Sequence, residues 1–245
     1  MAKRSGSDCR RWLALLLVFP FALPFTLITF PVSGADDWTE FRGPTGQGLS
    51  TSKGLPTEWG ADKNVAWKQE VSGLGWSSPV IVGGRIYLTT AAPAGADSKE
   101  LSLRALAFDA ATGKSLWREE VFHQDANAPK IHGKNSHASP TPVVHEGRLY
   151  VHFGHQGTAC LGLDGQVKWR NQELAYAPVH GNGGTPALVQ DILVFSADGA
   201  SDPFLAALDQ KSGQLRWKAS RGSDAPKKFS FSTPLVIQVD GQTQI

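Results

Sequence analysis

Cysteine is scarce in this sequence, with only Cys9 and Cys160 among its 245 residues. Cys9 precedes the apolar run of the N-terminal region, so it is not placed like the lipid-bearing cysteine of a lipoprotein. Cys160 lies inside the apolar run 158–161, where a small buried hydrophobic residue is expected rather than a reactive thiol. If the N-terminal region that contains Cys9 is removed, Cys160 alone remains and cannot form an internal disulfide. Packing must then stabilise the remaining chain.

Motifs of the common catalytic chemistries are also absent from the sequence. It contains no Gly-x-Ser-x-Gly nucleophile turn, no phosphate-cradling glycine loop and no adjacent pair of cysteines. The spacing of His152 and His155 matches no metal-binding signature. We therefore predict neither catalytic nor metal-binding residues.

The N-terminal 35 residues differ in kind from the rest of the chain. A basic start is followed by an apolar run from Trp12 to Phe30, which Pro20 and Pro24 interrupt, and then by the small residues 33–35. This pattern is typical of a secretory signal peptide, which we assign to residues 1–35. A retained membrane anchor is the alternative, because the run approaches the length of a bilayer span. Export would place the mature protein in the periplasm or outside the cell, with membrane contact only through the signal peptide.

The sequence also lacks a large excess of positive or negative charge. The whole chain carries a net charge of +2, but removing residues 1–35 takes Lys+Arg from 24 to 20 and Asp+Glu from 22 to 21, a net charge of −1. No basic stripe remains to neutralise phosphates, so we expect no nucleic-acid partner.

Glycine, proline and tryptophan, in contrast, are plentiful and recur at regular places, with 26, 15 and 8 residues respectively. Four segments join Ser or Thr to Pro and then continue as an apolar run: 78–82, 141–144, 185–189 and 233–237. After the first three, a turn leads to a second apolar segment: 84–88, 147–151 and 191–195. This periodicity predicts repeated pairs of antiparallel strands.

A second landmark closes each unit. Residues 107–117 (AFDAATGKSLW) are echoed at 207–217 (ALDQKSGQLRW), and a copy three residues shorter lies at 162–169. The tryptophans that end these segments, together with Trp67, are spaced by 50, 52 and 48 residues. The residues that define the landmark are Asp109, Thr112, Gly113 and Trp117, then Asp164 and Trp169, and finally Asp209, Ser212, Gly213 and Trp217.

Four short strands in about 50 residues make up one blade of a β-propeller. We therefore predict an all-β fold, a β-propeller built from four-stranded antiparallel blades, with about three blades and part of a fourth present. The expected parts are a cap and linker at 36–63 and a propeller at 64–245, comprising a closing strand at 64–71, blades at 76–122, 138–174 and 183–220, and a partial blade at 230–245. Because propellers close with four to eight blades, we interpret the sequence as the N-terminal part of a longer ring.

Each landmark has a physical role in such a blade. Proline suits the first position of a strand because it lacks an N–H group. The aspartate can accept backbone N–H bonds across the turn, and glycine supplies the positive φ of a tight hairpin. The tryptophan can fill the wedge between adjacent blades. We expect Trp117 and Trp217 to be largely buried, and Trp169, in the shortened copy, to tolerate substitution better.

The pattern Ala-x-Asp-x-x-Thr-Gly-x-x-x-Trp at 107–117 resembles the tryptophan-docking motif of the PQQ-like repeat family, to which quinoprotein dehydrogenases and BamB-like outer-membrane assembly factors belong. The copy at 207–217 differs only in carrying Ser212 in place of Thr. The resemblance covers roughly residues 65–245. It implies the propeller fold and leaves the function open.

The resemblance implies two kinds of function. Quinoprotein dehydrogenases of this type use a carboxylate base, a cation held by Glu, Asn and Asp, and often a vicinal cysteine pair. No residues here match that site by motif, so we expect no cofactor and regard PQQ binding as unlikely in this fragment. The leading interpretation is an exported non-catalytic scaffold that binds a protein or an extracellular polymer and is a monomer when full length. A fragment of a PQQ-dependent alcohol or sugar dehydrogenase is the alternative.

All seven histidines lie between positions 123 and 180. Two loops in equivalent positions, ahead of the Pro-led strands of the second and third blades, carry both His and Asn, so they should meet at one mouth of the propeller. Imidazole and amide groups there could hydrogen-bond a polar ligand. The candidate ligand-binding residues are His132, Asn135, His137, His180 and Asn182. Alternatively, Asn and Gly only shape these turns, and the remaining histidines are solvated or satisfied strand residues.

The signal-peptide assignment generates the first prediction. Because the basic start, the interrupted apolar run and the small residues end together at Ala35, we expect the exported protein to begin at residue 36. Intact-mass measurement of the exported protein checks this. A mass that includes residues 1–35 would contradict it and favour the anchor.

Overall fold

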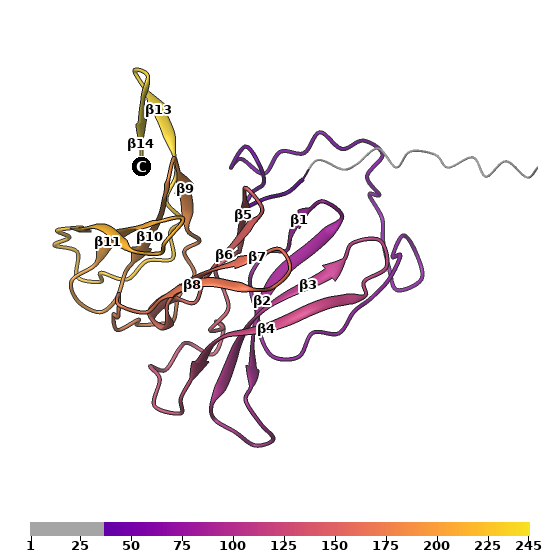
Figure 1. The fold of residues 1–245 in the computed structure, drawn as a ribbon, viewed down its shortest axis with the longest axis horizontal. Helices are drawn as coiled ribbons and strands as arrows, with labels where there is room; N and C mark the ends of the chain where they lie inside the picture. Colours follow the sequence, from indigo (N-terminus) through magenta and orange to yellow (C-terminus); the bar gives the residue numbers. More distant parts are fainter. Residues whose placement is uncertain (1–36) are drawn as a thin grey trace, which may run out of the picture. The chain divides into compact units, whose positions relative to one another are not determined.

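A computed structural model describes residues 37–245, so the expected signal peptide lies outside the described residues (Figure 1). Three four-stranded antiparallel sheets and one two-stranded sheet follow one another along the chain. The first sheet holds β1 (Val80–Val82), β2 (Arg85–Pro93), β3 (Leu101–Asp109) and β4 (Ser115–Gln124). The second holds β5 (Val143–His145), β6 (Arg148–His152), β7 (Thr158–Gly162) and β8 (Val167–Asn171). The third holds β9 (Ala187–Val189), β10 (Ile192–Ala197), β11 (Phe204–Asp209) and β12 (Leu215–Ser220), and β13 (Ile237–Val239) pairs with β14 (Gln242–Gln244).

Within each four-stranded sheet the spatial order of the strands is their order along the chain, so every connection is a hairpin. This meander is the topology of a propeller blade, and the predicted all-β fold with three blades and part of a fourth is confirmed. The first strand of each four-stranded sheet has only three residues, so this edge exposes few unpaired backbone groups. Within residues 37–245, no helix is long and apolar enough to cross a membrane.

The hairpin between the third and fourth strands of a blade is fixed by its aspartate. Asp109 accepts hydrogen bonds from the backbone N–H of Thr112 (2.8 Å) and from its hydroxyl (2.6 Å). Asp209 accepts the same pair of bonds from Ser212, at 2.8 and 2.9 Å. These bonds favour the ionised carboxylate and lower the pKa of both aspartates. Serine therefore replaces threonine in this turn without loss of the hydroxyl bond.

The tryptophans join consecutive blades. Each indole N–H donates to a backbone carbonyl in the third-to-fourth-strand turn of the next blade: Trp67 to Ala110 (3.0 Å), Trp117 to Leu163 (2.9 Å) and Trp169 to Gln210 (3.1 Å). The ring covers the turn glycine so closely that a Cβ added at Gly213 would lie 2.5 Å from the ring of Trp169. The glycine is therefore required by contact as well as by its positive φ of 73°.

This geometry corrects the expectations about individual tryptophans. The shortened turn receives Trp117, whereas Trp169 docks on the full-length turn of the third blade and is only 9% exposed. Trp169 is thus more deeply buried than expected. Trp217 is 38% exposed, and the prediction that it is largely buried is wrong. The reason is that no turn of this kind follows it within the described residues.

A second set of hydrogen bonds joins the blades at their first strands. The residue before each strand-leading proline donates its backbone N–H to the threonine hydroxyl at the same position of the next blade: Ser78 to Thr141 (3.0 Å), Thr141 to Thr185 (3.0 Å) and Thr185 to Thr233 (3.1 Å). We call this series the threonine ladder. It explains why Thr precedes proline in the last three of the four segments.

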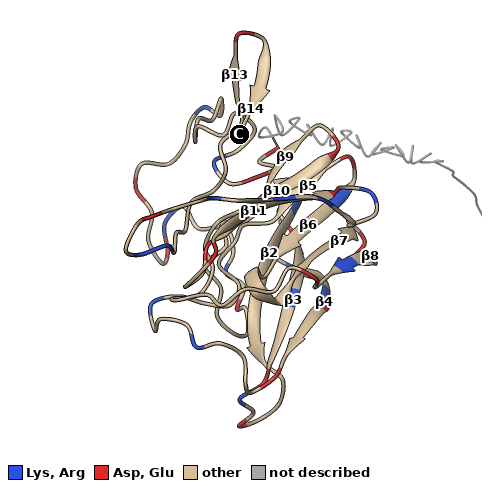
Figure 2. Ribbon diagram, turned by 90° about the vertical axis from the view of Figure 1, so that its left-hand side faces the viewer, with Lys and Arg blue, Asp and Glu red and all other residues tan. Residues whose placement is uncertain are grey.

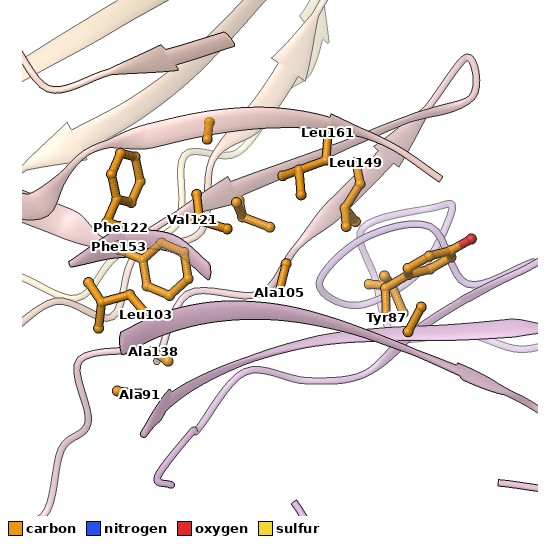
Figure 3. Close-up of a cluster of buried hydrophobic side chains, with 14 of the residues drawn as sticks. Tyr87, Ala91, Leu103, Ala105, Val121, Phe122, Ala138, Leu149, Phe153 and Leu161 are labelled. Carbon is orange, nitrogen blue, oxygen red and sulfur yellow. The ribbon is translucent and has the colours of Figure 1, made fainter. Parts of the chain in front are cut away.

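Apolar side chains fill the space between neighbouring blades. One cluster joins the first and second sheets and includes Tyr87, Leu103, Leu149 and Leu161, each 0% exposed (Figure 3). A second cluster joins the second and third sheets around Trp169. Cys160 belongs to this second cluster and is buried, as predicted. The wedge between adjacent blades is therefore the core of the protein.

The N-terminal segment bonds to the free edges of two first strands. Trp38 and Ile81 exchange backbone hydrogen bonds of 2.7 and 2.9 Å, and the N–H of Val144 donates to the carbonyl of Thr39 (2.8 Å). Residues 64–71, where a strand was expected, carry no strand, because no described strand lies alongside to pair with them. Trp67 nevertheless docks like the tryptophan of a fourth strand.

The docking geometry predicts unequal costs of truncation. Replacing Trp169 by Ala removes a buried indole and its hydrogen bond, and we expect the free energy of unfolding to fall by about 3–5 kcal/mol. The matched change Trp217→Ala removes an exposed ring and should cost less than about 1 kcal/mol. Urea denaturation of both variants measures the difference. Equal losses would contradict docking on the next blade.

Candidate functional site

The loops that precede the second and third blades meet, as the sequence predicts. We call them the leading loops, residues 125–142 and 172–186. The N–H of His132 donates to the carbonyl of His180 (3.3 Å), and the two imidazole rings lie edge to face with centroids 5.6 Å apart. Because these loops precede strands joined by the threonine ladder, they lie at matching positions on adjacent blades.

Asn135 holds the two leading loops together. Its amide nitrogen donates to the carbonyls of His180 (2.9 Å) and Asn182 (3.2 Å). Its amide oxygen accepts bonds from the N–H of Ser136 (2.8 Å) and the hydroxyl of Ser139 (2.6 Å). All four hydrogen bonds of the Asn135 side-chain amide are thus made to other groups of the protein. Asn135 acts as a structural tie at this site.

A pocket of about 590 Å³ opens beside these loops, and we call it the mouth pocket. Its lining combines aromatic rings with hydroxyl, amide and imidazole groups: Phe41, Trp76, His132, Lys134, Asn135, Ser139, Thr141, His180, Gly183, Thr185 and Phe231. Three of the five candidate residues therefore line one pocket. Its size is that of an ordinary small-molecule site.

His137 and Asn182 lie elsewhere. His137 lines a neighbouring pocket of about 440 Å³, and its Nε2 lies 3.3 Å from the amide nitrogen of Gln124. Asn182 accepts a hydrogen bond from the hydroxyl of Tyr176 (3.1 Å), while its amide nitrogen is buried with no partner. A Cβ added at Gly154 would lie 2.7 Å from the Cβ of Asn182, so the second blade presses directly on this residue.

Two further histidines lie beside this region: His152 is buried and His155 is half-buried. His152 is 1% exposed, shares a hydrogen bond of 2.8 Å with Thr158 and leaves its Nε2 without a partner. Burial, and to a lesser extent the neighbouring His155, lowers the pKa of His152 to about 3. Burial and His137 lower the pKa of His155 to about 4. The signal that could have revealed His152 is its position on β6, a strand inside a blade whose two faces are both covered. His155 lies beyond β6, in the short 3-10 helix Gly154–Gln156.

Few charged groups line the mouth pocket. Lys134 is the only formally charged lining residue, and no carboxylate borders the pocket. Within residues 37–245, no group of three His, Cys, Asp or Glu side chains is arranged to hold a metal ion. Burial raises the pKa of the Cys160 thiol, which is the opposite of what a nucleophilic thiolate requires.

Charges of both signs are spread over the described residues. Figure 2 shows Lys and Arg interspersed with Asp and Glu along the strands and loops, without a continuous basic band on the face in view. Most ion pairs are exposed, such as that between Arg170 and Glu119, and they contribute little to stability.

Comparison with known proteins gives one family and several structures. The family described as outer membrane protein assembly factor BamB matches residues 49–172. No curated protein sequence matches the chain. A quinohemoprotein alcohol dehydrogenase from Pseudomonas putida HK5 is 18% identical, with a TM-score of 0.46, and the match covers 63% of this chain and 22% of that one.

Two further structures are similar over part of their length. BamB from Moraxella catarrhalis is 20% identical with a TM-score of 0.34, and the match covers 56% of this chain and 33% of that one. A quinohemoprotein alcohol dehydrogenase from Comamonas testosteroni is 16% identical with a TM-score of 0.45, covering 61% of this chain and 21% of that one. The chain therefore spans a third or less of the length of these structures.

The buried histidines predict how stability depends on pH. The unfolded chain protonates His152 near pH 6.5, whereas the folded chain does so only near pH 3. The free energy of unfolding should therefore fall as pH drops from 6.5 to 5, by up to about 1.4 kcal/mol per pH unit from this residue. Urea denaturation at several pH values should show a shallower fall for His152→Gln than for the exposed control His145→Gln. Identical slopes would contradict burial of a neutral imidazole.

Proposed function

This chain belongs to the PQQ-like repeat family of β-propellers, because the family model described as BamB matches residues 49–172, half of the chain. We propose that it is an exported, non-catalytic binding scaffold whose ligand docks at the mouth pocket. The family supplies the blades, and blades alone do not specify a function. The proposal therefore depends on the site itself.

The meeting of His132 and His180 is the observation that carries the proposal. The two residues come from equivalent loops of adjacent blades, and their rings are 5.6 Å apart in the wall of the mouth pocket. Asn135 fixes both loops through four hydrogen bonds. A site held in place before the ligand arrives loses little conformational entropy on binding.

The same groups support binding rather than catalysis. Among the hydrogen bonds of residues 37–245, neither His132 nor His180 pairs its ring with a carboxylate or a hydroxyl, as a general base in a nucleophilic site would. The ring of His132 instead accepts the backbone N–H of Lys134 at Nδ1 (3.1 Å). This bond orients the imidazole toward the pocket.

The proposal includes location and partner. Removal of residues 1–35 on export would leave a mature protein in the periplasm or outside the cell, where a protein or an extracellular polymer could reach the mouth pocket. The complete ring would act as a monomer. A PQQ-dependent dehydrogenase is the alternative, and it would need a carboxylate base, whereas no carboxylate lines the mouth pocket.

A ligand panel tests the proposal. Differential scanning fluorimetry of the mature chain with galacturonate, glucose oligomers, a proline-rich peptide and PQQ with Ca²⁺ should give at least one upward shift of the melting temperature. We expect the double variant His132→Ala/His180→Ala to abolish that shift and the exposed control His145→Ala to keep it. No shift with any compound, or a shift that survives in the double variant, would contradict a binding mouth. Dye reduction with PQQ, Ca²⁺ and an alcohol would instead support the dehydrogenase.

A further inference from the structure

The mouth pocket is flanked by two large aromatic side chains at equivalent positions. The third residue before the strand-leading proline is Trp76 in the first blade, Ser139 in the second, Gly183 in the third and Phe231 ahead of β13. All four line the mouth pocket. The order large, small, small, large around the blades leaves a slot between the two rings.

Packing holds one wall of this slot. The rings of His132, His180, Phe229 and Phe231 form an edge-to-face series, with successive centroid distances of 5.6, 4.8 and 6.1 Å. A Cβ added at Gly183 would lie 3.0 Å from the ring of Phe231, so the small residue allows the ring to approach. On the other side, the N–H of Trp76 donates to the carbonyl of Ala138 (3.1 Å) and fixes the backbone there.

The flanking rings remain open to solvent. Trp76 is 64% exposed and Phe231 is 46% exposed, although both line a pocket. Exposed aromatic surface gathered in one concave place is typical of a site that buries a ligand. A ring-shaped ligand with apolar faces would cover both.

Two of the lining side chains, Lys134 and His132, can donate hydrogen bonds to a ligand. Since the Nδ1 of His132 accepts the N–H of Lys134, the neutral ring carries its proton on Nε2 and can donate it. The ammonium of Lys134 makes no salt bridge within the described residues. Because no carboxylate lines the pocket, it offers donors and a positive charge but no negatively charged acceptor. A ligand that supplies a carboxylate satisfies this set.

We propose that the mouth pocket binds an acidic sugar, a hexuronate unit of an extracellular polysaccharide. Its ring lies between Trp76 and Phe231, and its carboxylate accepts bonds from Lys134 and His132. The inference rests on the proposed binding function and names the ligand class for the same site.

Calorimetric titration of the mature chain with a trimer of α-1,4-linked galacturonate tests the proposal. The methyl-esterified trimer, which keeps the rings and loses the charge, should bind about tenfold more weakly. Trp76→Ala and Lys134→Gln should each weaken binding of the acidic trimer by about tenfold. The matched controls are Trp59→Ala, which removes a 72% exposed ring outside the pocket, and Lys130→Gln, an exposed lysine four residues from Lys134. Both should leave binding unchanged.

Three results would overturn the acidic-sugar assignment. They are no binding of the acidic trimer, equal binding of the ester, or unchanged binding by Trp76→Ala. Monomeric galacturonate, titrated in parallel, distinguishes a free sugar acid from a polymer, because a polymer site should bind the trimer more tightly. The thermal-shift panel described above separates the two proposals. If compounds other than uronates bind through His132 and His180, the acidic-sugar proposal is refuted and the proposed binding function stands. If nothing binds there, both fail.

Discussion

The hydrogen bond from one blade to the threonine hydroxyl of the next is the constraint on which the rest of the structure depends. Each bond of the ladder, such as Thr141 to Thr185, fixes the start of a first strand relative to its neighbour. The indole bonds, such as Trp169 to Gln210, fix the same two blades at their third-to-fourth-strand turns. With two separate points held, neighbouring blades cannot slide or rotate without breaking buried bonds. The apolar wedge between them then packs in one arrangement.

The candidate site inherits its geometry from this ladder. Each leading loop ends at a residue of the threonine ladder, so the ends of loops on adjacent blades lie side by side. His132 and His180 can therefore meet although 48 residues separate them in the sequence. Asn135 completes the arrangement because its amide nitrogen donates to the neighbouring loop while its amide oxygen accepts bonds from its own loop. Hydrogen bonds between blades thus continue into the walls of the mouth pocket.

Repetition made most of the fold predictable from the sequence. Recurring Ser/Thr-Pro and Asp-x-x-Thr-Gly segments revealed the blades and the loop positions, and hence the meeting of His132 with His180. The partners of the tryptophans were not predictable, because the docking turn of Trp169 lies 41 residues further along the chain. A blade buries both faces of its inner strands, so alternation along β6 could not reveal that His152 is enclosed. The aromatic flanks of the pocket were missed because Trp76 and Phe231 belong to different repeats.

Both sets of inter-blade bonds point the same way along the chain. The earlier blade donates and the later blade accepts, for the threonine ladder, for the indoles and for the arginine pairs Arg85 to Leu163 and Arg148 to Lys211. Arg170, which donates back to Val121, is an exception. The hydrogen bonds between blades therefore have one predominant direction along the chain, from the earlier blade to the later one. A blade leaving the ribosome presents unmet donors, and each following blade brings the acceptors that satisfy them. Such a chain can close progressively, in the order of its synthesis, without waiting for its far end.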